Sequence, residues 1–429
     1  DFVSNDHYFH EGASHLDELA CSDALMDSLA LGKPWYVMEH STSAVQWKPL
    51  NARKRAGELM RDSLAHVAMG ADAICFFQWR QSKSGAEAFH SAMLPHAGAD
   101  SKVFRGVCEL GKALKTLSDA GLQGTELERA GTAILFSAES EWATRSETLP
   151  SMKLNHWHDV RDWYRGFLDA GLRADVVPLA YDWTDYKTIV LPTVLSLSDE
   201  DVRRIADFAK AGGTVIVGYA TGLVDEYFHI GLGGYPGAGN GLLCDMLGIR
   251  SEEFNILGEE AEGEPSEISL SNGLATRLWQ NDVTSVAADT TVLASYTGES
   301  AADWELERTP AITSRPYGNG TAIYVGCDLN RYDIAQLLKA LGSRWRELSA
   351  QPTEGGQTPT YPTTDPRILH TIRRSADGST RFDFYLNRSN QPVAINGVEG
   401  KPIIAHRCET DAVGYTLNRN AILIAKTSC

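Results

Sequence analysis

The sequence predicts an α/β protein in which two runs of alternating strands and helices precede a small antiparallel β domain. Short apolar segments alternate with segments whose apolar residues have helical spacing, as in βαβ units. A stretch rich in Pro, Gly and Thr, Gln351–Pro366, then precedes short segments of alternating polarity. At 429 residues the chain is too long for one ordinary core. We therefore expect three domains, at residues 1–122, 123–350 and 360–429.

The first run is expected to contain about three βα units. Strands are predicted at Phe2–Ser4, Trp35–Met38 and Ala73–Trp79, and helices at Asn51–Met69, which Gly70 ends, and Val103–Leu117. The third of these strands is apolar almost throughout, which is typical of a parallel strand with both faces buried. Polar residues follow each strand, and in a (β/α)₈ barrel the chemistry is assembled at that end of the strands.

The second run begins near Gly131 and predicts a doubly wound α/β domain. We expect strands at 132–136, Ala174–Pro178, Thr188–Leu191 and Thr214–Gly218, and a helix at Asn155–Ala170. Ser198 and Asp201 have the spacing of a capping box, which predicts a helix that continues to Lys210 and stops at Gly212.

The glycine-rich stretch Gly231–Gly241 is predicted to be a loop followed by a helix. It resembles a phosphate-binding loop only superficially, since no strand precedes it and the Gly-Lys-Ser/Thr sequence is absent. A loop built for packing or for subunit contact explains it better.

Beyond the Pro/Gly/Thr-rich stretch, the short alternating segments predict an antiparallel β domain. Its expected strands are Leu369–Ile372, Arg381–Leu386, Pro392–Ile395 and Ala421–Ala425.

Charge and cysteine content narrow the class of function. The net charge of −17 disfavours nucleic acid and anionic membranes as partners, because a basic face is missing. The seven cysteines are scattered singly, so neither a disulfide framework nor a zinc ribbon is indicated. No apolar run is long enough for a membrane span. We expect a cytoplasmic protein that acts on a neutral solute, with no cofactor and no metal.

Glu39 is the first candidate for catalysis, since it ends an apolar strand and the polar loop His40–Ser43 follows it. Taken alone, such an acid is more often a solvated loop residue. Trp47 in the same loop, and Phe77, Glu87 and His90 after the next strand, change this interpretation. Aromatic rings stack on the apolar face of a sugar, while carboxylates and imidazole bond to its hydroxyl groups. The pattern therefore predicts a carbohydrate site.

A metal site formed by Glu87, His90 and His96 is the competing interpretation. No cysteine or aspartate completes a compact ligand set there, and nothing fixes the segment as a helix, so metal binding is disfavoured. The remaining histidines, among them His7 and His66, are expected to have structural or surface roles.

Two long motifs, YVMEHSTSAVQW and ICFFQWRQSKSGAEAFHSAMLPHAG, closely resemble the second half of the catalytic barrel of glycoside hydrolase family 42 β-galactosidases. VDEYFHIGLGGYPGAGNG is similar to a signature of that family's trimerisation domain, which has a glutamine-amidotransferase-like α/β fold. The last segment resembles the family's small C-terminal β domain. The resemblance implies about strands six to eight of a (β/α)₈ barrel, followed by these two domains, in a homotrimer.

Carried over by residue, the resemblance makes Glu39 the catalytic nucleophile of a retaining β-galactosidase. Trp47 matches the tryptophan that lines the galactose subsite, and Phe77, Glu87 and His90 match sugar-binding positions. The reaction implied is a double displacement through a galactosyl-enzyme, with two carboxyl groups about 5 Å apart. The substrate implied is a terminal β-D-galactosyl group.

The sequence departs from the family pattern at the acid/base, which the family carries in an Asn-Glu pair on the fourth barrel strand. No Asn-Glu pair occurs in these residues. We therefore expect the chain to be the C-terminal portion of a β-galactosidase and to be inactive in isolation. The alternative function is that of a non-catalytic oligomerisation or scaffold fragment.

Overall fold

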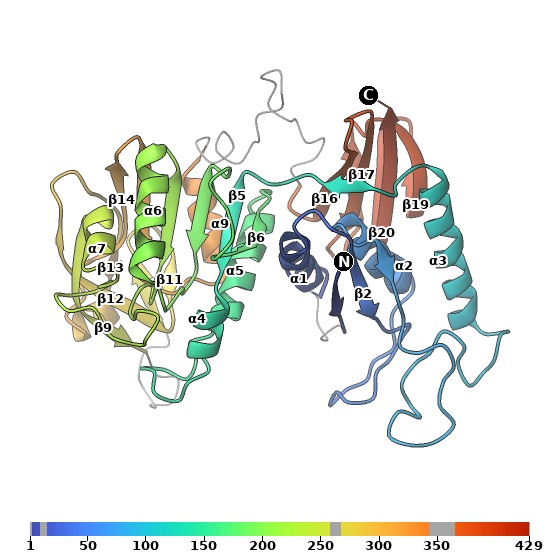
Figure 1. Ribbon diagram of the computed structural model, residues 1–429, viewed down its shortest axis with the longest axis horizontal. Coiled ribbons are helices and arrows are strands. Elements are labelled where there is room, and N and C mark those ends of the chain that lie inside the picture. The colour runs from blue at the N-terminus through green and yellow to red at the C-terminus, as the bar shows by residue number, and fades with distance from the viewer. Residues whose placement is uncertain (1, 9–14, 258–266, 343–364, 429) are drawn as a thin grey trace. The chain divides into compact units, whose positions relative to one another are not determined.

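The structure, a computed structural model, describes residues 2–8, 15–257, 267–342 and 365–428. The chain forms two compact units (Figure 1). One unit combines Asp1–Arg129 with Thr360–Cys429, and the other is Ala130–Pro359. Most of the predicted stretch Gln351–Pro366 lies outside the described residues, as do the expected boundaries at 350 and 360.

The N-terminal part of the first unit contains a small parallel sheet with helices packed on it. The strands β1 (Val3–Asp6), β2 (Trp35–Glu39) and β3 (Ala73–Ile74) lie in that order, each parallel to the next. The helices are α1 (His15–Ala30), α2 (Glu58–Ala68) and α3 (Lys102–Asp119). This confirms the α/β class of the segment and three consecutive parallel strands.

Two predicted bounds in this part are wrong. The helix expected at Asn51–Met69 begins only at Glu58, because residues 51–57 have no helical turns and Gly57 precedes the helix with a φ of 88°. The strand expected at Ala73–Trp79 is a regular strand only at Ala73–Ile74. The amides of Cys75 and Phe77 still donate to the carbonyls of Val37 and His40, so this segment follows β2 without a regular ladder.

The C-terminal part of the first unit is an antiparallel sheet of order β18-β20-β17-β16-β4, with β19 paired to β20. Its strands are β16 (Ile368–Ser375), β17 (Thr380–Asn387), β18 (Val393–Asn396), β19 (Lys401–Thr410), β20 (Gly414–Ser428) and β4 (Thr125–Leu127). The predicted strands of this domain are confirmed, and β19 was missed. Strand β4 lies in the range 123–350 expected for the middle domain, yet it pairs with β16.

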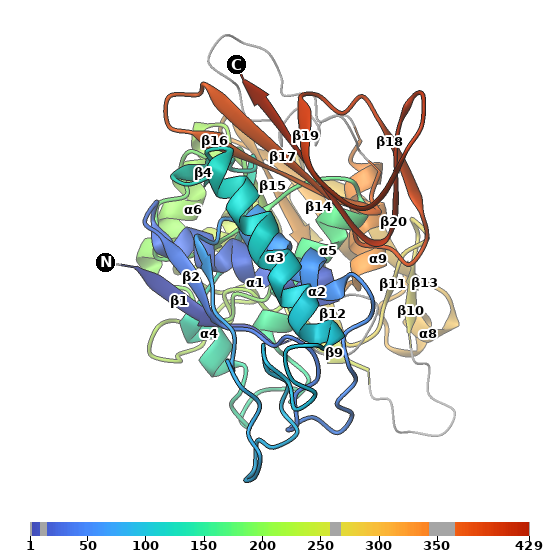
Figure 2. The ribbon, with the colours of Figure 1, turned by 90° about the vertical axis from the view of Figure 1, so that its right-hand side faces the viewer.

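Arg373 of β16 links the two parts of the first unit, which Figure 2 shows side by side. Its guanidinium donates to the carbonyls of Val67 and Ala71 at the end of α2 and to the carbonyl of Thr125, at 2.6–3.2 Å. The arginine is buried, so these carbonyls satisfy a charge that has little access to water.

A second link is the pair between Arg388, just after β17, and Asp17 of α1. Both nitrogens of the fork lie 2.7 Å from the two carboxylate oxygens, and each side chain is only 5% exposed. Bidentate geometry of this kind is the strong form of an ion pair.

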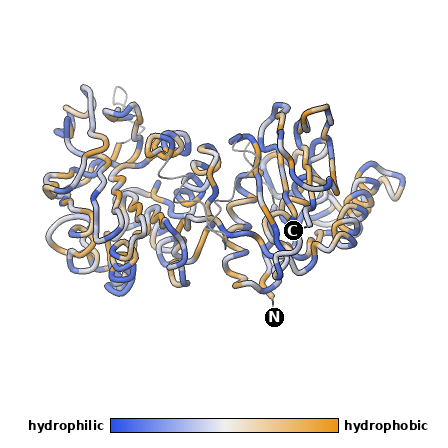
Figure 3. The backbone as a smooth tube through the Cα atoms, turned by 90° about the horizontal axis from the view of Figure 1, so that it is seen from above, coloured by the Kyte–Doolittle hydropathy of each residue, from blue (hydrophilic) through white to orange (hydrophobic). Residues whose placement is uncertain are grey.

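Only one face of helix α3 packs against the rest of this unit. Hydrophobic and hydrophilic residues alternate along it (Figure 3), and its buried residues Val107, Leu110, Ala113 and Leu117 recur every three or four positions. Ser101 caps the helix by accepting a hydrogen bond from the amide of Phe104. The helix predicted at Val103–Leu117 is thus confirmed.

The second unit is built on a mixed sheet of order β11-β10-β13-β14-β15-β8-β7-β5-β6, in which β15, β8, β7, β5 and β6 are mutually parallel. Strands β9 (Ile249–Ile256) and β12 (Trp279–Val286) form a separate antiparallel pair. The sheet strands are β5 (Thr132–Phe136), β6 (Asp175–Pro178), β7 (Thr188–Leu191), β8 (Thr214–Gly218), β10 (Ile268–Leu270), β11 (Ala275–Thr276), β13 (Thr291–Thr297), β14 (Pro310–Tyr317) and β15 (Gly320–Val325).

The helices of this unit are α4 (Ala138–Ala143), α5 (His156–Asp169), α6 (Asp199–Ala211), α7 (Leu242–Leu247), α8 (Glu299–Asp303) and α9 (Arg331–Ala340). The predicted capping box of α6 is confirmed: Ser198 accepts from the Asp201 amide, the Asp201 carboxylate accepts in return, and Gly212 ends the helix with a φ of 119°. The doubly wound arrangement expected from 131 to 218 is present, while the strands and helices from 249 onward were not predicted.

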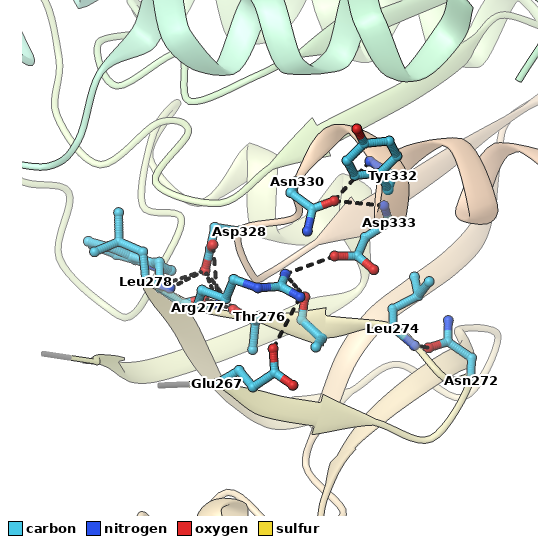
Figure 4. A network of polar contacts seen from close by, with 12 residues as sticks. Glu267, Asn272, Leu274, Thr276, Arg277, Leu278, Asp328, Asn330, Tyr332 and Asp333 are labelled. Atoms are coloured by element: carbon cyan, nitrogen blue, oxygen red, sulfur yellow. Dashed lines mark hydrogen bonds and ion pairs between the residues drawn. The ribbon is translucent and has the colours of Figure 1, made fainter. Parts of the chain in front are cut away.

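A polar network fastens the β11–β12 turn to the segment after β15 (Figure 4). Asp328 accepts hydrogen bonds from the amides of Leu278 and Trp279, both at 2.7 Å, and from the Thr276 hydroxyl at 2.6 Å. Arg277 lies in the same turn and forms an ion pair with Asp333 at 2.9 Å. A single carboxylate therefore satisfies several donors of the turn between β11 and β12.

Candidate active site

Glu39 is the last residue of β2 and is only partly exposed. The strand is held in place by the buried side chains of Trp35 and Val37, which alternate with outward-facing neighbours. One oxygen of the Glu39 carboxylate accepts a hydrogen bond from the Tyr8 hydroxyl at 2.7 Å. The carboxyl end of the neighbouring strand β1 thus provides a donor to the carboxylate, and the amide of His7 also donates to the Glu39 carbonyl at 2.9 Å.

Tyr8 connects Glu39 to a group of aromatic rings. Its ring meets the Trp47 ring edge-on, with centroids 4.8 Å apart, and Trp47 stacks on His90 at 5.0 Å with an interplanar angle of 23°. Phe77 also contacts His90, with its ring edge-on and the centroids 5.0 Å apart. Trp47 remains 51% exposed. The structure therefore brings four of the five predicted site residues into one continuous group, with an open aromatic surface beside a carboxylate.

His90 is buried and fixed by its neighbours. Its Nε2 lies 3.1 Å from the Phe77 carbonyl, so the ring donates through this nitrogen. Burial lowers the pKa of His90, while the bond to the Phe77 carbonyl and the charge of Glu87 oppose this shift. The imidazole is thus neutral at neutral pH and holds one orientation.

Glu87, the fifth predicted residue, is exposed and lies on the loop before His90. Its carbonyl accepts from the amide of His90 at 3.0 Å. Its charge reaches both His90 and Tyr8, where it contributes to a raised pKa of the phenol. The negative charge of Glu87 therefore acts on His90 and Tyr8. Among the described residues, its side chain has no hydrogen-bond partner.

The loops that carry these residues are joined to each other. The amide of Ser43 donates to the Ser91 hydroxyl and the amide of Ser91 donates to the Ala44 carbonyl, both at 2.9 Å. The loop with Trp47 and the loop with Glu87 and His90 therefore keep a fixed separation, although they lie far apart in the sequence.

Burial and negative charge both act on the groups around Glu39. Burial, the hydrogen bond to Glu39 and nearby carboxylates raise the pKa of Tyr8 far above its usual range, so the phenol stays protonated and donates. Burial and the charge of Glu39 also raise the pKa of Asp6, which faces Glu39 in the parallel register.

Three buried histidines, His7, His40 and His66, pack together next to Glu39, and we call them the histidine layer. The His40 and His66 ring centroids are 5.2 Å apart and those of His7 and His66 are 5.3 Å apart. His40 lies next to Glu39, with Nδ1 3.2 Å from the His7 carbonyl and Nε2 3.0 Å from Lys54 Nζ. Burial and the ammonium of Lys54 lower the pKa of His40, and burial lowers the pKa of Lys54 to about 8. His40 is therefore a neutral acceptor for Lys54.

Tyr8, His40 and Lys54 were not predicted as part of the site. Tyr8 follows the end of β1 by two residues, so its place after a strand is the signal that could have found it. His7 and His66 pack in the histidine layer, which fits the structural rather than the surface role predicted for them.

The metal interpretation gains no support from the geometry. In the described ranges, no three side chains of His, Cys, Asp or Glu converge as a ligand set. The His96 ring points to the Ser82 carbonyl at 2.7 Å, whereas the His90 ring points to Phe77.

The loop that follows Glu39 borders a pocket of about 180 Å³. It is lined by Ser41 and Ser43 and by cationic residues that include Lys48, Lys54 and Arg55. Neither Glu39 nor the aromatic group lines this pocket.

No helix in the described part of the chain has both the length and the apolar composition needed to cross a membrane.

Three family models match successive segments of the chain. They are described as β-galactosidase at residues 1–117, β-galactosidase trimerisation domain at 130–349, and β-galactosidase C-terminal domain at 368–427.

Among curated proteins, the chain is 44% identical over 428 residues to β-galactosidase BbgII of Bifidobacterium bifidum, covering 99% of this chain and 59% of that protein. It is 38% identical over 397 residues to a β-galactosidase of Arthrobacter sp., covering 92% of this chain and 53% of that protein. The chain thus spans little more than half the length of these relatives.

Solved structures give the same result. The β-galactosidase of Rahnella sp. R3 superimposes with a TM-score of 0.83 at 26% identity, covering 100% of this chain and 60% of that chain. Gan42B, described as a GH42 β-galactosidase, gives a TM-score of 0.83 at 25% identity with the same coverage.

Proposed function

Because the chain belongs to glycoside hydrolase family 42, the β-galactosidases, we propose that it supplies the nucleophile and part of the galactose site of a retaining β-galactosidase. The substrate is a terminal β-D-galactosyl group. Glu39 attacks the anomeric carbon, the aglycone departs, and water then hydrolyses the galactosyl-enzyme.

One observation carries this proposal: the Glu39 carboxylate accepts the Tyr8 hydroxyl at the edge of the Tyr8–Trp47–His90 aromatic group. The donor orients the carboxylate and stabilises its ionised, nucleophilic form. The exposed face of Trp47 supports stacking of the sugar ring, Phe77 lines the sugar site, and Glu87 with His90 holds the hydroxyl groups in register. Binding energy of this kind positions the anomeric carbon for attack.

We also propose that β1, β2 and β3 correspond to about strands six to eight of a (β/α)₈ barrel. The acid/base carboxyl then comes from a segment outside these 429 residues, and the chain alone hydrolyses galactosides poorly. The division at 1–122, 123–350 and 360–429, assembly as a homotrimer and a cytoplasmic location belong to the same proposal. The match of 130–349 to a trimerisation domain supports the trimer.

The test is covalent labelling by 2,4-dinitrophenyl 2-deoxy-2-fluoro-β-D-galactoside. Dinitrophenolate leaves without a proton, so the first step needs no acid/base group, and the fluorine slows hydrolysis of the product. We expect a single added 2-fluorogalactosyl group, mapped by peptide mass spectrometry to Glu39.

Glu39→Gln and Glu87→Gln are the matched controls. The first should abolish labelling, whereas the second should slow it and leave the label on Glu39. A label on another carboxylate, or labelling that persists in Glu39→Gln, would overturn the role of Glu39. A folded oligomer that takes no label would favour the scaffold function instead.

A further inference from the structure

The pocket bordered by the loop after Glu39 carries an excess of positive charge, and we call it the basic pocket. Its volume of about 180 Å³ is far more than the roughly 10–15 Å³ that one water molecule needs. Its lining includes four cationic side chains and two carboxylates: Lys48, Arg53, Lys54, Arg55, Glu58 and Asp62. The two charges in excess attract anions, in a chain whose overall charge of −17 repels them.

The two carboxylates of the basic pocket are already bonded within the chain. Asp62 is buried and accepts hydrogen bonds from Nε and Nη2 of Arg61, at 2.8 and 2.6 Å. Although burial raises the pKa of Asp62, Arg61 and His15 lower it further, so that this pKa lies far below its usual range. One oxygen of Glu58 accepts from the Arg55 amide. Because Arg61 neutralises Asp62 without lining the pocket, the lining cations stay in excess.

Three donors of the basic pocket have no partner among the described residues. The guanidinium groups of Arg53 and Arg55 form neither an ion pair nor a hydrogen bond there, and both residues are exposed. Ser41 is only 3% exposed, yet its hydroxyl also lacks a hydrogen-bond partner. Buried hydroxyl groups are nearly always hydrogen-bonded in native structures, so this one calls for a water or a ligand in the pocket.

Lys54 joins the basic pocket to the strand end that carries Glu39. Its Nζ lies 3.0 Å from Nε2 of His40, which directly follows Glu39. Burial lowers the pKa of Lys54 to about 8, while the charges of Asp62 and Glu58 oppose this shift. The ammonium is therefore protonated at neutral pH although it has little access to water, and a bound anion stabilises such a charge.

We propose that the basic pocket binds a phosphate group, either as inorganic phosphate or as part of a small phosphate monoester. A phosphate group near neutral pH carries a charge of about −2, which matches the excess of two cationic side chains. Its oxygens accept several hydrogen bonds at once. The planar forks of Arg53 and Arg55 suit this geometry, and the Ser41 hydroxyl adds a donor. A carboxylate ligand offers fewer oxygens and less charge.

Isothermal titration calorimetry of the 429-residue chain tests the proposal. The probes are inorganic phosphate and glycerol 3-phosphate, with glycerol as the uncharged control and sodium chloride holding the ionic strength constant. We expect saturable binding of one phosphate group per chain and no binding of glycerol. Heat that does not saturate, or that sodium chloride at the same ionic strength reproduces, would overturn the site.

The two phosphate probes distinguish the sources of the group. Val45 and Leu50 also line the basic pocket, so the carbon atoms of a monoester find apolar contacts there. Tighter binding of glycerol 3-phosphate than of inorganic phosphate identifies a monoester as the ligand. The reverse order identifies the free ion.

Arg55→Gln locates the binding in the basic pocket. It should weaken phosphate binding about 10-fold or more, since one charged hydrogen-bonding group is lost. Arg105→Gln is the matched control, because it removes the same charge from an arginine of α3 whose side chain is 60% exposed and lies outside the pocket. The control should leave the affinity unchanged. Equal weakening by the two variants would show a general effect of charge and refute the site.

Ser41→Ala separates binding from folding. Because the hydroxyl has no partner among the described residues, its removal should leave the melting temperature of the ligand-free chain unchanged or slightly higher. The same variant should weaken phosphate binding about 3-fold or more, since one donor to the phosphate is lost. Circular dichroism measures the first effect and calorimetry the second. A melting temperature that falls by several degrees, or an unchanged affinity, would overturn the role of Ser41.

Discussion

Asp328 provides the sharpest test of how the second unit holds together. Replacing it by alanine removes the acceptor for the amides of Leu278 and Trp279 and for the Thr276 hydroxyl (Figure 4). The consequences differ among the donors. Thr276 retains a bond to the Trp279 carbonyl at 2.9 Å, and the exposed Arg277 amide, which also donates to Asp328 at 3.1 Å, gains water. The amides of Leu278 and Trp279 lose the partner that they have in the structure.

The expected cost follows from these two amides. Trp279 is fully buried and Leu278 partly buried, and a buried donor without a partner costs about 1–3 kcal/mol. We therefore expect Asp328→Ala to lower the free energy of unfolding by about 3 kcal/mol. For a unit of this size that corresponds to a fall of roughly 6–12 °C in the melting temperature.

Chemical denaturation followed by tryptophan fluorescence is the assay, because Trp279 lies in the network. Asp328→Asn keeps one oxygen acceptor in the same place and should cost only about 1 kcal/mol. Glu267→Ala removes an exposed ion-pair partner of Arg277, 3.1 Å away, and should cost less than about 1 kcal/mol. If Asp328→Ala were no more destabilising than Glu267→Ala, the hydrogen bonds would not hold the turn and the reasoning would fail.

Three further predictions concern other contacts. Tyr8→Phe should slow covalent labelling of Glu39 about 10-fold or more, since a 2.7 Å bond to a carboxylate is lost; an unchanged labelling rate would show that Tyr8 does not orient it. Arg388→Ala should lower the stability of the first unit by about 3–5 kcal/mol in urea, because it leaves the buried Asp17 carboxylate without its bidentate partner; a loss below 1 kcal/mol would contradict this. Burial lowers the pKa of His156, so as the pH falls the unfolded chain binds this proton first and stability decreases below about pH 6.5. His156→Gln should reduce this loss of stability by up to about 1.4 kcal/mol per pH unit. An identical dependence of stability on pH in the variant would refute the prediction.

Local sequence signals predicted the fold best where particular residues specify backbone hydrogen bonds at a helix end. The capping box of Ser198 and Asp201 and the stop at Gly212 are found where predicted, because these residues act within one helical turn. Helix α1 was missed because its buried face includes polar residues, Asp17 and Asp23 among them, so it has no clear apolar stripe. After residue 249, β9 pairs with β12 and β10 with β13 across intervening elements, which a local pattern does not encode, whereas β14 and β15 form a hairpin that a local pattern could have found.

The candidate site groups residues that the sequence singled out with supports that it did not. Glu39, Trp47, Phe77 and His90 were singled out because their types suit sugar binding and because they follow strands. Tyr8 was missed, since its contact with Glu39 depends on the parallel register of β1 and β2. The roles of these residues stay predictions until the labelling is done.

The division of the first unit between residues 1–129 and 360–429 sets an order of events during synthesis. The ribosome completes the contiguous unit 130–359 before it makes any of the strands β16 to β20. Until then the carbonyls at the end of α2 lack Arg373, and α1 lacks Arg388. The nascent segment 1–129 therefore remains incompletely packed while about 230 residues are synthesised. Such a segment is a natural client for a chaperone, and slow translation of the middle unit would lengthen its exposure.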